Sequence, residues 1–394
     1  MGKIAFVSPW YGNDIPGGAE TALRGIIMHL KDAGVDLEVL TTCVKQFTAD
    51  WNENYYKSGL EMVSDVPVRR FKVRKRNVKK FDSINAKLIM GQPVSAEEEE
   101  VFMQEMVNSP DLYDYISSHK DEYDAFVYIP YMFGTTYYGI LACPEKAIVI
   151  PCFHEESYIH MQIYKKAFEN VRGIIYLAQP EMDTAHKVFD FSNVKEAVIG
   201  TGVDTDIEYS ASRFREKFGI DSPFVLYAGR KDVGKNVNVL VDYFSKYKKQ
   251  NEDSDVKLVL IGGGSIDVPA NVKDDVIDLG FVDIQDKIDA YAAATLLCQP
   301  STHESFSIVI MESWLCDRPV LVHRDCDVTR EFVRTANGGL FFGDYYEFEA
   351  CLDYILANES DASVMGNQGK KFVLENFDWK IVTKKICDFL DDCR

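Results

Sequence analysis

Two short apolar runs in the last third of the chain enclose a polar stretch, and this arrangement constrains the fold more than any other feature. The runs are residues 295–298 and 320–322. Between them lie Glu304 and, about two turns into a predicted helix that begins near Ser305, Glu312. The order strand, loop, helix, turn, strand is typical of a right-handed parallel crossover. We therefore expect a parallel α/β sheet whose ligands collect beyond the carboxyl ends of its strands.

The predicted helix start favours an anionic ligand. Backbone N–H groups of Ser305, Phe306 and Ser307 would point out of the first helical turn. An anion bound there would lie between Glu304 and Glu312, whose carboxylates accept hydrogen bonds from hydroxyl groups. A sugar nucleotide offers this combination of phosphate and hydroxyls. For two isolated glutamates, ordinary solvated charges would be the simpler interpretation, so the rest of the chain has to decide.

Composition limits the class of protein. A chain of 394 residues predicts two domains, and its hydrophobic content of 46% is ample for buried cores. Nine scattered cysteines without a C-x-x-C pair indicate neither a disulfide framework nor a zinc site. The net charge of −19 argues against general nucleic-acid binding. With no apolar run approaching the ~18 residues of a membrane helix, we expect a cytoplasmic protein.

Two series of predicted strands alternate with helical segments. The first series is 4–8, 37–40, 66–73, 125–129, 147–150 and 174–177, and the second is 224–228, 257–261, 276–279, 295–298 and 320–322. This alternation predicts two doubly wound Rossmann-like domains facing a central cleft, where a ligand would bind by default. We expect a first domain over residues 1–205 and a second over 206–376, with a helix in 377–394 returning to the first.

Several loops that follow predicted strands carry residues suited to anion binding. Gly17 and Gly18 lie in the first such loop, and His154 follows a later strand. Residues 229–236 place Arg230 and Lys235 beside a helix start, which suits a phosphate. Residue 236 is Asn, whereas a Walker loop requires a magnesium-binding hydroxyl there, so this is not a kinase-like loop.

In this order, these motifs resemble the GT-B glycosyltransferases of family 4, which are retaining and use nucleotide sugars. The resemblance rests on Gly17-Gly18, His154, Gly202-Val203-Asp204, Gly229 through Lys235, Ile261 through Gly264, Gly280-Phe281-Val282 and Glu304-x7-Glu312. It covers nearly the whole chain, most strongly residues 224–342 and least residues 43–120. It implies a GT-B fold whose C-terminal helix crosses back to the first domain.

The resemblance also implies roles for individual side chains. Arg230 and Lys235 would neutralise the donor diphosphate. Glu304 would contact the donor sugar, and Glu312 would hold the ribose hydroxyls. His154 would face the reacting centre and, with Glu304, Arg230 and Lys235, makes up the expected catalytic set.

The other donor-binding positions that the resemblance implies are Gly17, Gly18, Gly263, Phe281, Val282, Ser305, Phe306 and Ser307. The amides of residues 305–307 would bind the terminal phosphate, and backbone near 281–282 the base. At Ser307 many relatives have glycine, which suggests a tighter sugar pocket.

The implied activity is transfer of a hexose-type sugar from a nucleoside diphosphate, of UDP or GDP type, to a hydroxyl of a glycan or lipid-linked acceptor. Such a reaction would contribute to cell-surface polysaccharide or glycan assembly. We expect no metal cofactor, because Arg230 and Lys235 already supply two charges. A sugar-nucleotide epimerase of the same architecture and a non-catalytic nucleotide-sugar-binding protein are the alternatives.

The basic stretch from Arg69 to Lys80 stands out in an acidic chain. It holds eight basic residues and no acidic one. Alternation predicts a strand with Phe71 and Val73 inward and the charges, Arg70 among them, outward. The alternative hypothesis is that the stretch binds an anionic membrane surface or a pyrophosphate-bearing acceptor, which would make the protein peripheral at the inner membrane face.

Overall fold

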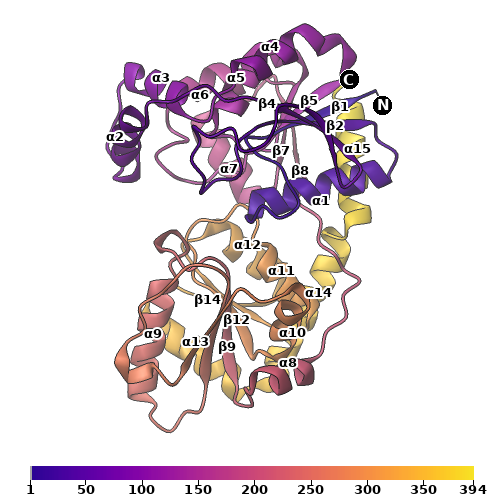
Figure 1. The fold of residues 1–394 in the computed structure, drawn as a ribbon. Coiled ribbons are helices and arrows are strands. Elements are labelled where there is room, and N and C mark those ends of the chain that lie inside the picture. The colour runs from indigo at the N-terminus through magenta and orange to yellow at the C-terminus, as the bar shows by residue number, and fades with distance from the viewer. Residues whose placement is uncertain (1) are drawn as a thin grey trace. The chain divides into compact units, whose positions relative to one another are not determined.

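The computed structural model describes residues 2–394, which separate into two α/β units (Figure 1). The first unit extends to Gly202 and includes the C-terminal segment Lys380–Arg394. The second unit is Val203–Trp379. None of the helices in residues 2–394 is long and apolar enough to cross a membrane.

The first unit is built on an eight-stranded sheet with the order β3-β4-β2-β1-β5-β6-β7-β8. Its pairings are parallel except for β3, which runs antiparallel to β4. The strands are β1 (Ile4–Val7), β2 (Leu37–Thr42), β3 (Gly59–Val63), β4 (Val66–Phe71), β5 (Ala125–Tyr128), β6 (Ala147–Val149), β7 (Gly173–Tyr176) and β8 (Lys195–Val198).

The helices of this unit are α1 (Gly18–Asp32), α2 (Val78–Ile89), α3 (Ala96–Glu105), α4 (Pro110–His119), α5 (Gly134–Ala142), α6 (Ile163–Phe168), α7 (Gln179–Val188) and α15 (Trp379–Asp392). Helix α1 buries Leu23, Ile26, Ile27 and Leu30, the face that the sequence predicts. Helix α3 begins with a capping box between Ser95 and Glu98. Strands β1, β2 and β5 to β7 are buried along their whole length, as parallel strands covered on both faces are.

The second unit has a six-stranded, fully parallel sheet with the order β11-β10-β9-β12-β13-β14. The strands are β9 (Phe224–Ala228), β10 (Lys257–Ile261), β11 (Val276–Gly280), β12 (Leu296–Gln299), β13 (Val320–His323) and β14 (Gly339–Phe342). The helices are α8 (Ala211–Phe218), α9 (Val237–Gln250), α10 (Ile284–Ala293), α11 (Ile308–Leu315), α12 (Asp327–Ala336), α13 (Tyr345–Ala357) and α14 (Glu359–Asn376).

The strand order of the second unit is the Rossmann order, in which chain direction across the sheet reverses between the first and fourth strands. That reversal lies between β9 and β12, which pair directly. In the first unit the corresponding reversal lies between β1 and β5. Ligands of such sheets bind beyond the carboxyl ends of the strands at the reversal.

Three strands, β3, β8 and β14, are absent from the sequence prediction. Each is an edge strand of its sheet. Most residues of each are exposed or only half-buried, so these strands lack the apolar run that identifies a buried strand.

Candidate functional site

The loops after β9 and β12 form the candidate site of the second unit. They are separated by about 70 positions in the sequence, but they follow neighbouring strands at the reversal point of the sheet. The side-chain amide of Asn236 donates a hydrogen bond to the carbonyl of Pro300 at 3.0 Å, which ties the two loops together. The parallel topology thus places residues 229–236 beside residues 300–307.

Lys235 and Glu304 meet across these loops. The Lys235 ammonium lies 2.7 Å from the Glu304 carboxylate, and both side chains are largely buried. Arg230 occupies the same loop as Lys235, but its side chain is mostly exposed and its guanidinium lies 3.5 Å from Asp232. The site therefore offers one cation paired with a carboxylate and a second, accessible cation.

The helix after Glu304 begins later than the sequence predicts. Helix α11 begins at Ile308, not near Ser305. Ser307 adopts a left-handed conformation (φ 74°) that cannot continue a right-handed helix, so residues 305–307 form the loop that enters it. The amides of the first helical turn therefore belong to residues from Ile308 onward, and the prediction for Ser305, Phe306 and Ser307 is wrong on this point.

The side chains of this loop are packed inward. The Phe306 ring is buried edge-on against Phe332 and Phe377, with centroids 5.3 and 4.9 Å away. Only the backbone of Phe306 is therefore placed to meet a ligand. The Ser307 hydroxyl is buried without a hydrogen-bond partner among the described residues.

Glu312, in the second turn of α11, is held by two side chains of α10. Lys287 donates to one carboxylate oxygen at 2.6 Å and Tyr291 to the other at 2.8 Å. Neither residue figures in the sequence prediction. Their spacing of four positions in a helical segment was the available signal, but only the fold reveals that this helix face meets Glu312.

The loops after β10 and β11 approach the same edge of the sheet. A Cβ added to Gly262 would lie 2.1 Å from the carbonyl oxygen of Gly229, so the backbones of these loops touch and glycine is required. A Cβ at Gly263 would lie 2.6 Å from the ring of Phe281, whose side chain is 78% exposed. Two of the predicted donor-binding positions, Gly263 and Phe281, are thus in contact.

In the first unit, the predicted residues follow strands β1 and β6. Gly17 (φ 141°) precedes the first residue of α1, Gly18, where an added Cβ would meet no atom within 4 Å. His154 follows β6, is partly exposed and has its Nδ1 atom 3.6 Å from Glu156. Both segments lie beyond the carboxyl ends of parallel strands, as predicted.

A buried carboxyl group, that of Glu181, lies beside the loop that carries His154. Glu181 is absent from the sequence prediction. Its two oxygens accept hydrogen bonds from the backbone N–H groups of Phe153 at 2.8 Å and Leu177 at 2.6 Å. Burial raises the pKa of Glu181 to about 7, while these backbone donors and the charge of His154 oppose the shift. Glu181 therefore ties the loop that carries His154 to the end of β7.

The side chains of the basic stretch do not alternate between inward and outward as the sequence predicts. Arg70 is buried, not outward: it is ion-paired with Glu61, and its guanidinium donates to the carbonyl of Tyr11 at 3.0 Å. Phe71 is only half-buried. The reason is that Glu61 on the neighbouring strand β3 neutralises Arg70, a partner that the alternation pattern does not contain.

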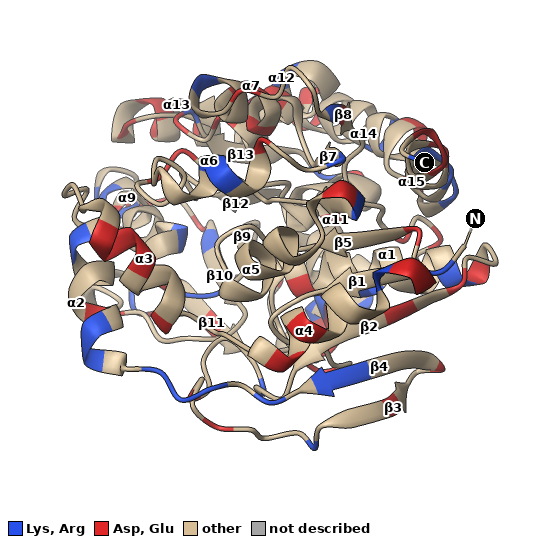
Figure 2. Cartoon of the chain, turned by 90° about the horizontal axis from the view of Figure 1, so that it is seen from above, with Lys and Arg blue, Asp and Glu red and all other residues tan. Residues whose placement is uncertain are grey.

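Other arginines of the stretch are also engaged. Arg69 pairs with Glu38 at 3.4 Å and Arg74 with Glu105 at 3.1 Å. The Arg76 guanidinium lies over the rings of Trp51 and Phe81. Figure 2 shows the basic residues running from β4 into the segment before α2. The exposed cations that remain are Lys72, Lys75, Lys79 and Lys80.

A family comparison matches most of the second unit. Residues 210–372 match the model of the family described as "Glycosyl transferases group 1". The match lies within the second unit and covers less than half of the chain. The matched region contains the loops after β9 and β12, and with them Arg230, Lys235, Glu304 and Glu312.

Curated relatives are similar over part of the chain. An uncharacterized glycosyltransferase of Methanocaldococcus jannaschii is 24% identical over 58% of this chain and 61% of its own length. A D-inositol 3-phosphate glycosyltransferase of Xylanimonas cellulosilytica is 26% identical over 54% of this chain and 52% of its own length. The matched segments thus span about half to three fifths of these relatives.

Solved structures share the fold over the whole chain. Sucrose-phosphate synthase from Thermosynechococcus elongatus has a TM-score of 0.71 at 17% identity, covering 100% of this chain and 99% of that one. HepE of Anabaena, in complex with UDP-glucose, has a TM-score of 0.67 at 17% identity and 99% coverage of both chains. The predicted fold class, an α/β GT-B fold of two Rossmann-like units, is confirmed.

Proposed function

We propose that this protein is a retaining glycosyltransferase of the family 4 type, which moves a hexose-type sugar from a nucleoside diphosphate to an acceptor hydroxyl. The observation that carries the proposal is the Lys235–Glu304 pair at the strand reversal of the second unit, within the region that matches the group 1 family model, with Arg230 and Glu312 in the same unit. Solved structures of HepE with UDP and with UDP-glucose support a nucleotide-sugar donor.

In the proposed reaction, the bond between the anomeric carbon and the diphosphate oxygen breaks, and its electron pair leaves with the diphosphate. The acceptor hydroxyl oxygen bonds to the anomeric carbon, and its proton passes to an oxygen of the departing diphosphate. Lys235 and Arg230 would stabilise the charge on the departing diphosphate, and Glu304 would orient the sugar hydroxyls. His154 is assigned to the reacting centre by the family resemblance, and replacing it with Ala is expected to slow transfer.

Charge in the loop after β9 also leads us to propose that transfer needs no divalent ion. Arg230 is accessible, and Lys235, which is shared with Glu304, places a second cationic group beside the diphosphate, the role that a metal plays elsewhere. We expect unchanged transfer rates in excess EDTA. Loss of activity that magnesium restores would contradict this proposal.

The acceptor is proposed to be a glycan or a lipid-linked glycan, with the exposed lysines at positions 72, 75, 79 and 80 attracting an anionic membrane surface or a pyrophosphate group. The ion pairs of Arg69, Arg70 and Arg74 reduce the basic stretch to these four exposed cations and half-buried Arg76. Each cation near an anionic leaflet contributes ~1 kcal/mol, so four suffice for measurable binding.

The deciding experiment measures donor binding and turnover separately. UDP, GDP and ADP are screened for thermal stabilisation, and the matching sugar nucleotides are then incubated with and without acceptor sugars. A transferase releases nucleoside diphosphate when an acceptor is present, whereas an epimerase converts the donor alone. Binding without either reaction would indicate a binding protein.

Two variants test the assigned roles. Glu312→Ala is expected to weaken nucleoside diphosphate binding by ~1.5–3 kcal/mol, because a hydrogen bond to a charged group is lost. Glu304→Ala is expected mainly to slow transfer. Glu375→Ala, on the exposed surface of α14, is the control. Unaltered affinity and transfer rate in both variants would show that the site lies elsewhere.

A further inference from the structure

Both oxygens of the Glu312 carboxylate are engaged by one face of α10. Lys287 and Tyr291, four positions apart, donate to separate oxygens at 2.6 and 2.8 Å. Tyr291 is fully buried, and burial together with the charge of Glu312 raises its pKa well above the ordinary value. Tyr291 therefore keeps its proton and remains a hydrogen-bond donor. Both of these donors come from α10.

The hydrogen-bond acceptor positions of Glu312 that remain free match the two hydroxyl groups of a vicinal diol. A carboxylate offers about four lone-pair positions, of which Lys287 and Tyr291 use two. The two that remain can accept from two adjacent hydroxyl groups, such as those of a ribose. Lys287 also neutralises Glu312, just as Lys235 neutralises Glu304, so that neither carboxylate repels an anionic diphosphate.

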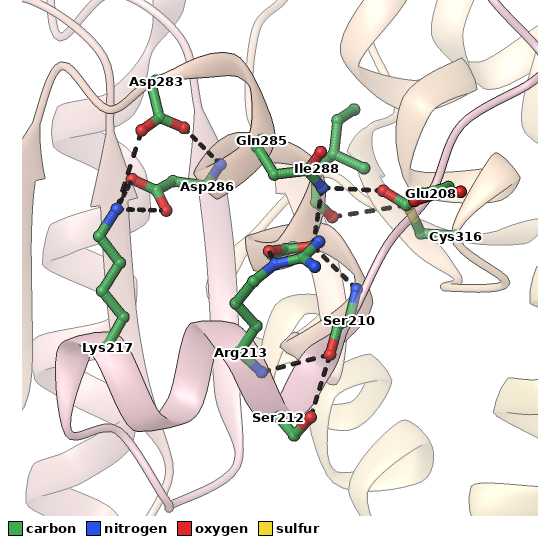
Figure 3. Close-up of polar contacts among 11 residues, drawn as sticks. Glu208, Ser210, Ser212, Arg213, Lys217, Asp283, Gln285, Asp286, Ile288 and Cys316 are labelled. Atoms are coloured by element: carbon green, nitrogen blue, oxygen red, sulfur yellow. Dashed lines mark hydrogen bonds and ion pairs between the residues drawn. The ribbon is translucent and has the colours of Figure 1, made fainter.

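Helix α10 is itself anchored on a different face, by α8. Lys217 binds Asp286 at 2.6 Å, and Figure 3 shows its ammonium between Asp283 and Asp286. The buried carboxylate of Asp289 is ion-paired with Arg213 and accepts the backbone N–H of Ser210 at 2.8 Å. These contacts fix the rotation of α10 and leave Lys287 and Tyr291 directed at α11.

We propose that Lys287 and Tyr291 are positioning residues that hold the Glu312 carboxylate for the ribose hydroxyls of the donor. This inference rests on the proposed function, in which Glu312 binds ribose. Lys287 supplies charge compensation as well as orientation, and Tyr291 supplies orientation alone. Both act through Glu312, so their effect should depend on the hydroxyl that Glu312 recognises.

The test compares ribonucleotides with 2′-deoxyribonucleotides. Isothermal titration calorimetry measures UDP, GDP and ADP against their 2′-deoxy forms on the full-length protein. We expect the wild type to prefer its ribonucleotide by about tenfold or more, since one hydrogen bond to a charged acceptor is at stake. Lys287→Met and Tyr291→Phe should weaken ribonucleotide binding and shrink that preference, whereas Lys287→Arg should retain most of it.

Lys371→Met is the matched control, because it removes a lysine paired with a glutamate on the exposed surface of the same unit. Thermal unfolding of every variant verifies folding. If the wild type does not prefer the ribonucleotide to its 2′-deoxy form, or if the Glu312→Ala variant keeps that preference, the ribose assignment in the proposed function is overturned. A preference that disappears in Glu312→Ala but survives in both Lys287→Met and Tyr291→Phe overturns this inference alone.

Discussion

At the residue scale, the pKa of Glu181 differs between the folded and the unfolded chain. Its pKa is about 7 in the folded state, against 4.5 for an unperturbed Glu, because its carboxyl is buried. The native state therefore binds a proton more tightly than the unfolded state. This contribution to stability is fully present below about pH 4.5 and is lost as the pH rises through 7.

Replacing Glu181 with Gln should remove this pH dependence. Between pH 7 and pH 4.5, the wild type should gain about 3 kcal/mol of unfolding free energy relative to Glu181→Gln, as the shift of 4.5 to about 7 implies. Urea denaturation of both proteins across this range measures the difference. If the difference does not vary with pH, the carboxyl is not protonated in the folded protein near neutrality.

At the element scale, one buried lysine joins the ends of three strands. Lys231 follows β9, and its ammonium donates at 2.6 Å both to Asp278 of β11 and to the carbonyl of Gly262 after β10. The Lys231 side chain is almost fully buried, whereas Asp278 is partly exposed. This pair therefore sets the relative positions of the loops that hold Arg230, Gly263 and Phe281.

A double-mutant cycle tests the pair. Asp278→Leu should destabilise the protein by about 2 kcal/mol, less than a fully buried pair costs, because it leaves the Lys231 charge uncompensated. Lys231→Met combined with Asp278→Leu should recover most of that loss, since neither charge remains. Chemical denaturation of the two single variants and the double variant gives the coupling energy. Additive effects would mean that the two side chains do not interact.

At the scale of the whole molecule, a net charge of −19 opposes binding to an anionic surface, so any attraction must be local. The variant that tests the membrane proposal changes Lys72, Lys75, Lys79 and Lys80 to Ser and keeps the structurally engaged arginines. Co-sedimentation with phosphatidylserine vesicles at low salt should decrease in this variant.

A charge-matched control distinguishes an effect of these four lysines from an effect of the overall net charge. It changes exposed lysines elsewhere, at positions 249, 273, 371 and 385, to Ser. This control should bind vesicles as the wild type does. Absence of wild-type binding at low salt, or equal loss in both variants, would remove the proposed role of residues 69–80 at a membrane.

Periodicity and turn residues in the sequence were sufficient to predict the buried strands, helix α1 and the crossover around Glu304. Local rules apply to these elements because their hydrogen bonds and apolar spacing involve near neighbours. The sequence also places Lys235 and Glu304 in loops after strands, whereas the strand order that makes these loops neighbours comes from the fold. Exposed edge strands such as β3 lack that spacing and were missed.

Tertiary structure alone decided which charges meet. The sequence predicts that Arg70 points outward, but in the fold β3 places Glu61 beside it. The sequence shows no partner for Glu312, but in the fold α10 contributes Lys287 and Tyr291. The start of α11 at Ile308 likewise depends on the left-handed Ser307, next to the packed ring of Phe306. Such pairings join residues far apart in the chain, and the free energy of an ion pair depends on distance and burial, neither of which a local sequence pattern contains.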